Sequence, residues 1–192
     1  MRMPPWPRAA AARRLPAMAL LALAGCGRSP PPAASPPVPS APAPQADCAA
    51  PQLALTLDSR DGWFDGMSHS GTMLVLRNVG QAACRIPAWL IPRLQDASGR
   101  PLALSDPAPP DDVRRDPPPS VELPPGASAE SAMRWVSGDV YDHGRCLSPA
   151  FVTLAIGTGQ VSAAFAGHLC GPGDKPPAYT LTPFKAAASS PR

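Results

Sequence analysis

Three histidines are the side chains of this sequence best suited to acid–base chemistry near neutral pH, because imidazole titrates in that range. His69 lies between Ser68 and Ser70. Asp61 and Asp65 precede it, so one short segment holds the residue types of a hydrolase triad. It has no G-x-S-x-G turn or other context for a serine nucleophile. The favoured interpretation is a solvated loop with local hydrogen bonds.

The other two histidines also lie in segments with the composition of loops. His143 follows Asp139 and Asp142 among glycines, which fits an exposed turn as well as an acid–base set. His168 lies in a further loop-like segment. None of these sets predicts a reaction, so we expect no catalytic residues and no bound cofactor, with a hydrolase as an alternative.

A second candidate chemistry is copper binding by Met67, His69 and Met73. This set could bring two thioethers and an imidazole together, and soft sulfur ligands suit Cu(I). However, Met73 begins an apolar run typical of a packed strand, and the spacing differs from the separated methionine and histidine pairs of bacterial copper chaperones. We expect no metal site and keep periplasmic copper binding as an alternative.

Aromatic residues near loops are candidate ligand contacts, because they stack on sugars and anchor protein partners. Trp63 and Phe64 lie beside His69 in the segment 61–71, which we predict to carry the contact surface. Trp89 is a further candidate, although packing between sheets is its favoured interpretation.

The N-terminal 25 residues have the pattern of a secretory signal. Four arginines precede the apolar segment 15–23, and no acidic residue occurs there. That segment is too short for a membrane span, which needs about 20 apolar residues. The run Leu23-Ala24-Gly25-Cys26 ends it and resembles a bacterial lipobox. We expect cleavage before Cys26 and attachment of a diacylglycerol to its thiol.

The predicted location is the cell envelope. Gly27 follows the cysteine at the position where an aspartate favours the inner membrane, so we expect the periplasmic face of the outer membrane if the cell is Gram-negative. Four of the 17 basic residues are removed with the signal. The mature chain keeps its 14 acidic residues, so its net charge is close to zero. Without a basic stripe, we expect no nucleic-acid partner.

Residues 26–47 are almost entirely Pro, Ala and Ser after the cysteine. Such a segment cannot bury a core and samples extended polyproline II. At about 3.1 Å per residue, it could hold a domain up to about 65 Å from the bilayer. We predict a disordered tether.

Residues 48–184 have the length of one domain, and 185–192 are expected to be a disordered tail. Apolar runs in the domain are short and lack a 3.6-residue period, which favours strands. Pro92 places its strand at an edge, and the Pro- and Asp-rich section 105–120 is predicted to be an exposed excursion. An all-β, immunoglobulin-like two-sheet sandwich is predicted, with a closed barrel as the alternative. The expected strands cover 53–57, 72–77, 89–94, 102–104, 129–136, 151–156, 161–165 and 178–182.

Four cysteines remain once Cys26 is set aside, an even number that suits disulfides in an exported chain. They allow three connectivities. Pairing neighbours within each half gives Cys48 with Cys84 and Cys146 with Cys170, which is the arrangement we prefer. A zinc site is the alternative, although no C-x-x-C pair is present.

Two blocks of sequence resemble a known family. The first runs from Leu74 to Gly80 and is followed by Cys84; the second is 123–129, which leads to Arg134-Trp135. Together with the cysteines, they are similar to the domain of unknown function 4232 over most of 48–170. The resemblance implies an exported β-sandwich, often lipid-anchored, without an established activity. The segment 86–89 departs from the commoner Gly-aromatic-Pro turn.

These observations lead to one expectation about function. We expect a bacterial cell-envelope lipoprotein that is not an enzyme and acts as a binding or interaction module. Its partners would be the membrane, through the N-terminal lipid, and an envelope protein or glycan.

Overall fold

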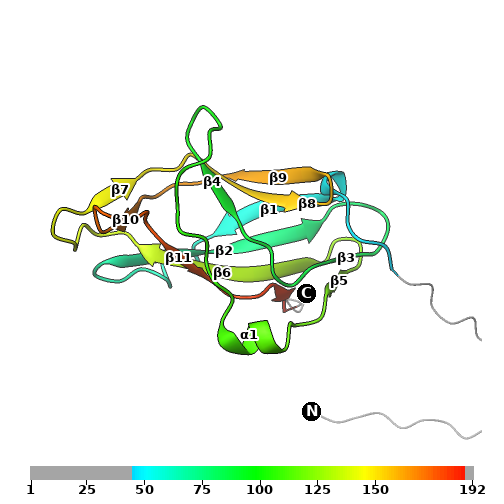
Figure 1. Cartoon of the computed structure of the whole chain (residues 1–192). Coiled ribbons are helices and arrows are strands. Elements are labelled where there is room, and N and C mark those ends of the chain that lie inside the picture. Colours follow the sequence, from blue (N-terminus) through cyan, green and yellow to red (C-terminus); the bar gives the residue numbers. More distant parts are fainter. Residues whose placement is uncertain (1–44, 189–192) are drawn as a thin grey trace, which may run out of the picture. The chain divides into compact units, whose positions relative to one another are not determined.

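Two antiparallel sheets face each other across an apolar core (Figure 1). The structure is a computed structural model that describes residues 45–188. The predicted signal peptide, Cys26 and all but the last residues of the predicted tether lie outside the described residues. In the part of the chain that is described, no helix is long and apolar enough to cross a membrane.

The larger sheet has the strand order β1-β2-β6-β11, and β12 also pairs with β6. Alternate residues of β2 and β6 point into the core, among them Leu74, Leu76 and Met133. This period-two pattern is what one buried and one outer face require. The strands are β1 (Leu53–Asp58), β2 (His69–Asn78), β6 (Ser128–Val136), β11 (Tyr179–Leu181) and β12 (Lys185–Ala186).

The smaller sheet has the order β4-β8-β9 and covers the core from the other side. It consists of β4 (Arg93–Gln95), β8 (Phe151–Ile156) and β9 (Gly159–Ala164). Val152 and Leu154 are fully buried in the core cluster. β4 is an edge strand, as Pro92 predicted, and the Pro92 carbonyl accepts a hydrogen bond from the buried Tyr179 hydroxyl at 2.7 Å.

Two short strand pairs complete the β structure. β3 (Cys84–Ile86) pairs with β5 (Val121–Leu123), and β7 (Arg145–Leu147) pairs with β10 (Leu169–Gly171). The helices are short: η1 (Ala50–Gln52) precedes β1, and α1 (Asp111–Arg115) lies in the predicted excursion.

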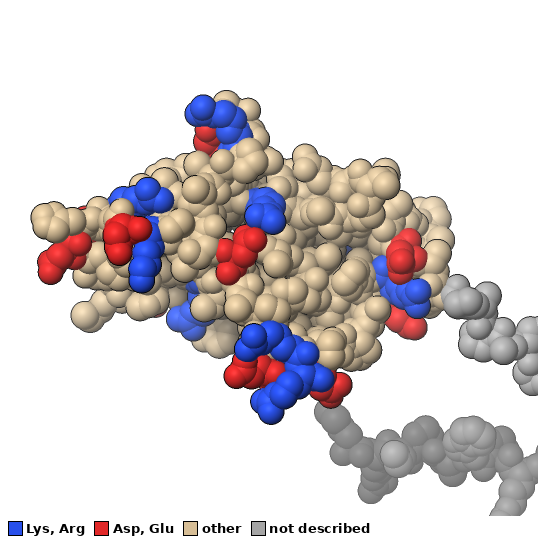
Figure 2. All heavy atoms as spheres, in the orientation of Figure 1, with Lys and Arg blue, Asp and Glu red and all other residues tan. Residues whose placement is uncertain are grey.

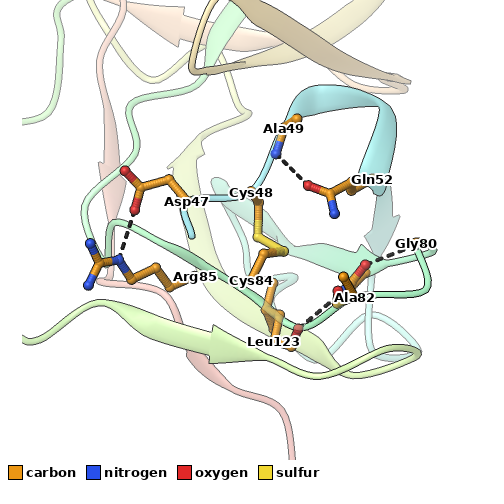
Figure 3. The surroundings of a disulfide bond; sticks show 10 residues. Asp47, Cys48, Ala49, Gln52, Gly80, Ala82, Cys84, Arg85 and Leu123 are labelled. Atoms are coloured by element: carbon orange, nitrogen blue, oxygen red, sulfur yellow. Dashed lines mark hydrogen bonds and ion pairs between the residues drawn. A yellow bond between two sulfur atoms is a disulfide. The ribbon is translucent and has the colours of Figure 1, made fainter. Parts of the chain in front are cut away.

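The disulfides join Cys48 to Cys84 and Cys146 to Cys170, which is the pairing preferred from the sequence. The first connects the start of the described chain to β3, beside an ion pair between Asp47 and Arg85 (Figure 3). The second joins directly opposed residues of β7 and β10. The first bond therefore ties the entering chain to β3, and the second ties β7 to β10.

The predicted all-β sandwich is confirmed, and three local predictions are wrong. The predicted strand at 89–94 begins only at Arg93, and 102–104 forms no strand, because the prolines at 92 and 101 cannot donate ladder hydrogen bonds. β4 pairs with β8, and the segment after the turn returns only as an isolated bridge between Gln95 and Pro101. Lys185 and Ala186 form β12 where a disordered tail was expected, because the β6 edge offers free backbone partners there.

The Asp96–Gly99 turn is stabilised by one carboxylate. Oδ1 of Asp96 accepts hydrogen bonds from the Ser98 hydroxyl at 2.6 Å, from the Ser98 N–H at 2.8 Å and from the Arg100 N–H at 3.0 Å. These donors favour the charged form of the carboxyl group, so they lower the pKa of Asp96 to about 2. The hydrogen bond from the Ser98 hydroxyl has the largest effect. The turn predicted from the sequence is thus held by local polar contacts.

The two ends of the sandwich carry different segments. The described chain enters beside β3 and β5, whereas the loops 59–68 and 137–144 extend from the opposite end (Figure 1). On the face shown in Figure 2, charged side chains form small groups of mixed sign among uncharged ones.

Candidate functional site

The proposed triad residues form two separate pairs. Ser68 Oγ lies 3.1 Å from Nδ1 of His69, and the Ser70 hydroxyl donates to Asp65 at 3.1 Å. A triad requires one imidazole to bond to both the nucleophile and the carboxylate. Here no hydrogen bond within the described residues links His69 to Asp61 or Asp65, and the pairs are exposed.

Within the described residues, neither of the other histidines hydrogen-bonds to these pairs, although His168 lines a hollow together with Asp65 and Ser70. His143 is exposed and has a left-handed backbone with φ of 52°, which is typical of a turn. Within residues 45–188, it has no hydrogen bond or ion pair to Asp139 or Asp142. The same described region contains no group of three or more His, Cys, Asp and Glu side chains arranged to hold a metal.

The copper candidates are spread along β2 and the loop before it. His69 and Met73 are both in β2, where four residues of extended chain span about 13 Å. Phe64 packs on Gly71, which lies between them on that strand. Met67 is fully exposed in the preceding loop. The structure therefore does not bring the three side chains together.

Phe64 is buried against the outer face of the large sheet, although it was expected in the contact surface. It is 4 % exposed and lies over Gly71, where an added Cβ would be 3.0 Å from the Phe64 ring. The same Cβ would be 2.7 Å from the Met133 carbonyl oxygen. Gly71 therefore creates the space that Phe64 fills, and the ring anchors loop 59–68 to the sheet.

The turn before Phe64 directs Trp63 outward. Arg60, Asp61 and Gly62 have φ angles of 52°, 54° and 79°, so three successive residues are left-handed. This conformation costs about 1 kcal/mol for each residue with a Cβ. Ion pairs from Arg60 to Asp58 and Glu130 hold the turn in place.

Three exposed apolar side chains lie in the loops at this end, and we call them together the distal tip: Trp63, Met67 and Val140. Trp63 is 78 % exposed, as the predicted contact surface requires, and Val140 is 60 % exposed. The two loops are joined because the Ser68 carbonyl accepts from the N–H groups of Ser137 and Gly138. Large exposed apolar side chains on connected loops are typical of a contact surface.

Trp89 belongs to the packing of the domain. It is half-buried against the core cluster. With Pro109, Val113 and Pro118, it lines a cavity of about 360 Å³ under the excursion that contains α1. Its role as a covered side chain was the favoured sequence interpretation.

A cleft of about 450 Å³ lies beside the distal tip, and most of its residues were not predicted. We call it the basic cleft. Of the site residues predicted from the sequence, His69 lines this cleft. Arg134 and Lys175 also line it, and only the folding of the chain brings these two distant residues to the same cleft. The alternation of β6 could have shown that Arg134 faces outward, but not that Lys175 lies near it. The polar and aromatic lining residues are His69, Ser105, Arg134, Trp135, Tyr141, Lys175, Tyr179 and Thr180.

A third hollow, of about 490 Å³, opens between the sheets at the same end. Trp135, Asp65 and His168 are among its lining residues. The Trp135 ring packs on Phe165 with centroids 5.2 Å apart, and its buried Nε1 has no hydrogen-bond partner among the described residues. A further hollow, of about 880 Å³, is a groove between the edge strands β1 and β9, and Asp47 is its one charged lining residue within the described chain.

The fold and these surfaces define a disulfide-bonded, all-β sandwich domain that presents loops and clefts at one end. Residues 48–185 match the model of the family described as domain of unknown function DUF4232. The chain therefore belongs to the DUF4232 family. No curated protein and no solved structure was found to match it.

Proposed function

We propose that this protein is a lipid-anchored module of the bacterial cell envelope that binds an envelope protein through its distal tip, without catalysing a reaction. The observation that carries the proposal is the exposure of Trp63, Met67 and Val140 at the end of the sandwich opposite the entry of the chain. A lipidated Cys26 and an extended tether would place that end away from the bilayer.

The construction of loop 59–68 supports a contact role. Phe64 is fixed under the loop, and Arg60 is fixed by two ion pairs, so Trp63 is presented from an ordered support. An exposed tryptophan on an ordered loop loses little conformational freedom when it binds, which favours affinity. Tryptophan is also among the residues that most often dominate a binding interface.

Position-specific photocrosslinking in cells tests the tip. A photoreactive phenylalanine analogue at position 63, 67 or 140 is expected to capture one partner of the same mass. The matched control is position 79, because Val79 is also an exposed apolar residue, at 52 %, but lies at the end of β2 near the entry of the chain. Equal capture from position 79, or no capture from the tip, would contradict the proposal.

Trp63→Ala is expected to weaken binding of the captured partner by about thirtyfold, the effect of a residue worth about 2 kcal/mol at an interface. Val79→Ala should leave binding unchanged. Titration of the purified partner against both variants measures the difference. Phe64 is left intact because its removal would alter the loop itself.

The lipid anchor is tested separately. Cys26→Ala removes the thiol that would carry the diacylglycerol, so the protein is expected to move from the membrane fraction to the soluble envelope fraction or to remain as an uncleaved precursor. Mass spectrometry of the wild-type N-terminus should show an acylated cysteine. An unmodified Cys26 in the mature wild-type protein would show that no lipid anchor is present.

A further inference from the structure

The basic cleft has the shape of a site for a small molecule. Its volume of about 450 Å³ lies within the range of ligand pockets, about 300 to 1,000 Å³. One wall comes from the ends of β6 and β11, and the other comes from the segment that follows β10. Cys170 lines the cleft, so the disulfide to Cys146 fixes that wall.

Charge distinguishes this cleft from the other hollows. Arg134 and Lys175 both line it, whereas no aspartate or glutamate does. Within the described residues, neither cation forms an ion pair with a carboxylate. The neighbouring acids in sequence, Asp106, Asp142 and Asp174, are exposed and outside the lining, and Asp106 forms an ion pair with Arg93. Two cations beside a concave surface without a carboxylate favour an anion.

Arg134 is held in place by an aromatic ring. Its Cζ lies 5.9 Å from the centroid of Phe64, which is the geometry of a cation–π contact. Within residues 45–188, its guanidinium donates no side-chain hydrogen bond to a protein acceptor. Arginine donors of this kind match the paired oxygens of a carboxylate or phosphate.

The remaining walls of the basic cleft are suited to contact the apolar part of a ligand. Val136, Pro172, Pro176 and Ala178 provide apolar surface, and the Tyr141 ring lies among them. Such walls favour a flat ring or short hydrocarbon part, whereas the cations favour the acidic group attached to it. Thr180 and Ser105 add hydroxyl groups to the lining.

We propose that the basic cleft binds a small organic anion, with its carboxylate or phosphate on Arg134 and Lys175 and its apolar part between Tyr141 and the prolines. This site is separate from the partner contact of the distal tip and does not depend on it. The acidic headgroup of a membrane lipid has the same chemistry, so the experiment distinguishes a soluble anion from a lipid.

Calorimetric titration of the full chain in phosphatidylcholine nanodiscs tests the proposal, with phenyl phosphate and benzoate as anionic probes and benzamide as the uncharged control. The anions are expected to bind, and benzamide at least about tenfold more weakly. Arg134→Gln and Lys175→Gln should each weaken anion binding by about tenfold, the effect of losing one charge-assisted hydrogen bond. The matched controls Arg115→Gln and Lys185→Gln should leave it unchanged, because both residues are exposed and outside the cleft.

Nanodiscs that contain phosphatidylglycerol identify the source. Competition by that lipid with phenyl phosphate would assign the cleft to membrane headgroups, whereas undiminished binding would assign it to a soluble anion. Failure of both anions to bind would overturn the proposal. Equal weakening by the cleft variants and by the controls would also overturn it, because the effect would then come from net charge. Circular dichroism of each variant confirms that the fold is intact.

Discussion

Asn78→Ala is expected to destabilise the domain by about 3 to 5 kcal/mol, because it removes one buried and two partly buried hydrogen bonds to backbone groups. The Asn78 side-chain amide donates to the carbonyls of Leu123 at 2.8 Å and Ala82 at 2.9 Å. Its carbonyl oxygen accepts from the Gly80 N–H at 2.9 Å. One fully buried side chain therefore joins β2, the following loop and β5.

Denaturant unfolding measures this loss, and Val79→Ala is the matched control. Val79 is the exposed neighbour of Asn78, so its truncation should change the free energy of unfolding by no more than about 0.5 kcal/mol. Asn78 is the only asparagine of the chain, so selective labelling gives one side-chain amide signal for hydrogen exchange. Rapid exchange of that amide, or a loss below about 1 kcal/mol, would refute its role as a buried link.

Removing the first disulfide is expected to have the second large effect. The double substitution of Cys48 and Cys84 by alanine should cost about 4 kcal/mol, because the bond closes a loop between residues 36 apart in sequence. Both sulfur-bearing side chains are also buried, and both belong to the core cluster. Their truncation therefore removes packing as well as the constraint on the unfolded chain.

The second disulfide is the internal comparison. Cys146 and Cys170 are 24 residues apart, and Cys146 is exposed. The loop-entropy model gives about 3.5 kcal/mol for this bond, and less buried packing is lost with it. Unfolding midpoints of the two double variants under oxidising conditions should place the Cys48–Cys84 variant lower. The reverse order would show that the core does not depend on that bond.

The longer strands were predictable from local sequence. Leu53 and Leu55 in β1 carry the period-two pattern within a single segment, and the short apolar runs that became β8 and β9 are joined by a glycine-containing turn. The strands β3, β7 and β10 have three residues each, so no period can be read from them. Their pairing is defined by the partner strand and the disulfides.

The candidate site was predictable only in part, because several of its residues are placed by partners that are distant in sequence. Trp63 was expected in a contact loop, and it is exposed there. The burial of Phe64 depends on its contact with Gly71, which the local sequence does not indicate. Arg134 and Lys175 lie far apart in sequence and meet because β11 pairs with β6.

The position of β6 has a consequence for folding order. This strand pairs with β2 on one side and takes its other partners, β11 and β12, from the last described residues of the chain. Until those residues are synthesised and in place, β6 has an unpaired edge that another chain could join. A truncation before Tyr179 would make that aggregation-prone intermediate permanent. The C-terminal strands thus protect the nascent sheet against self-association.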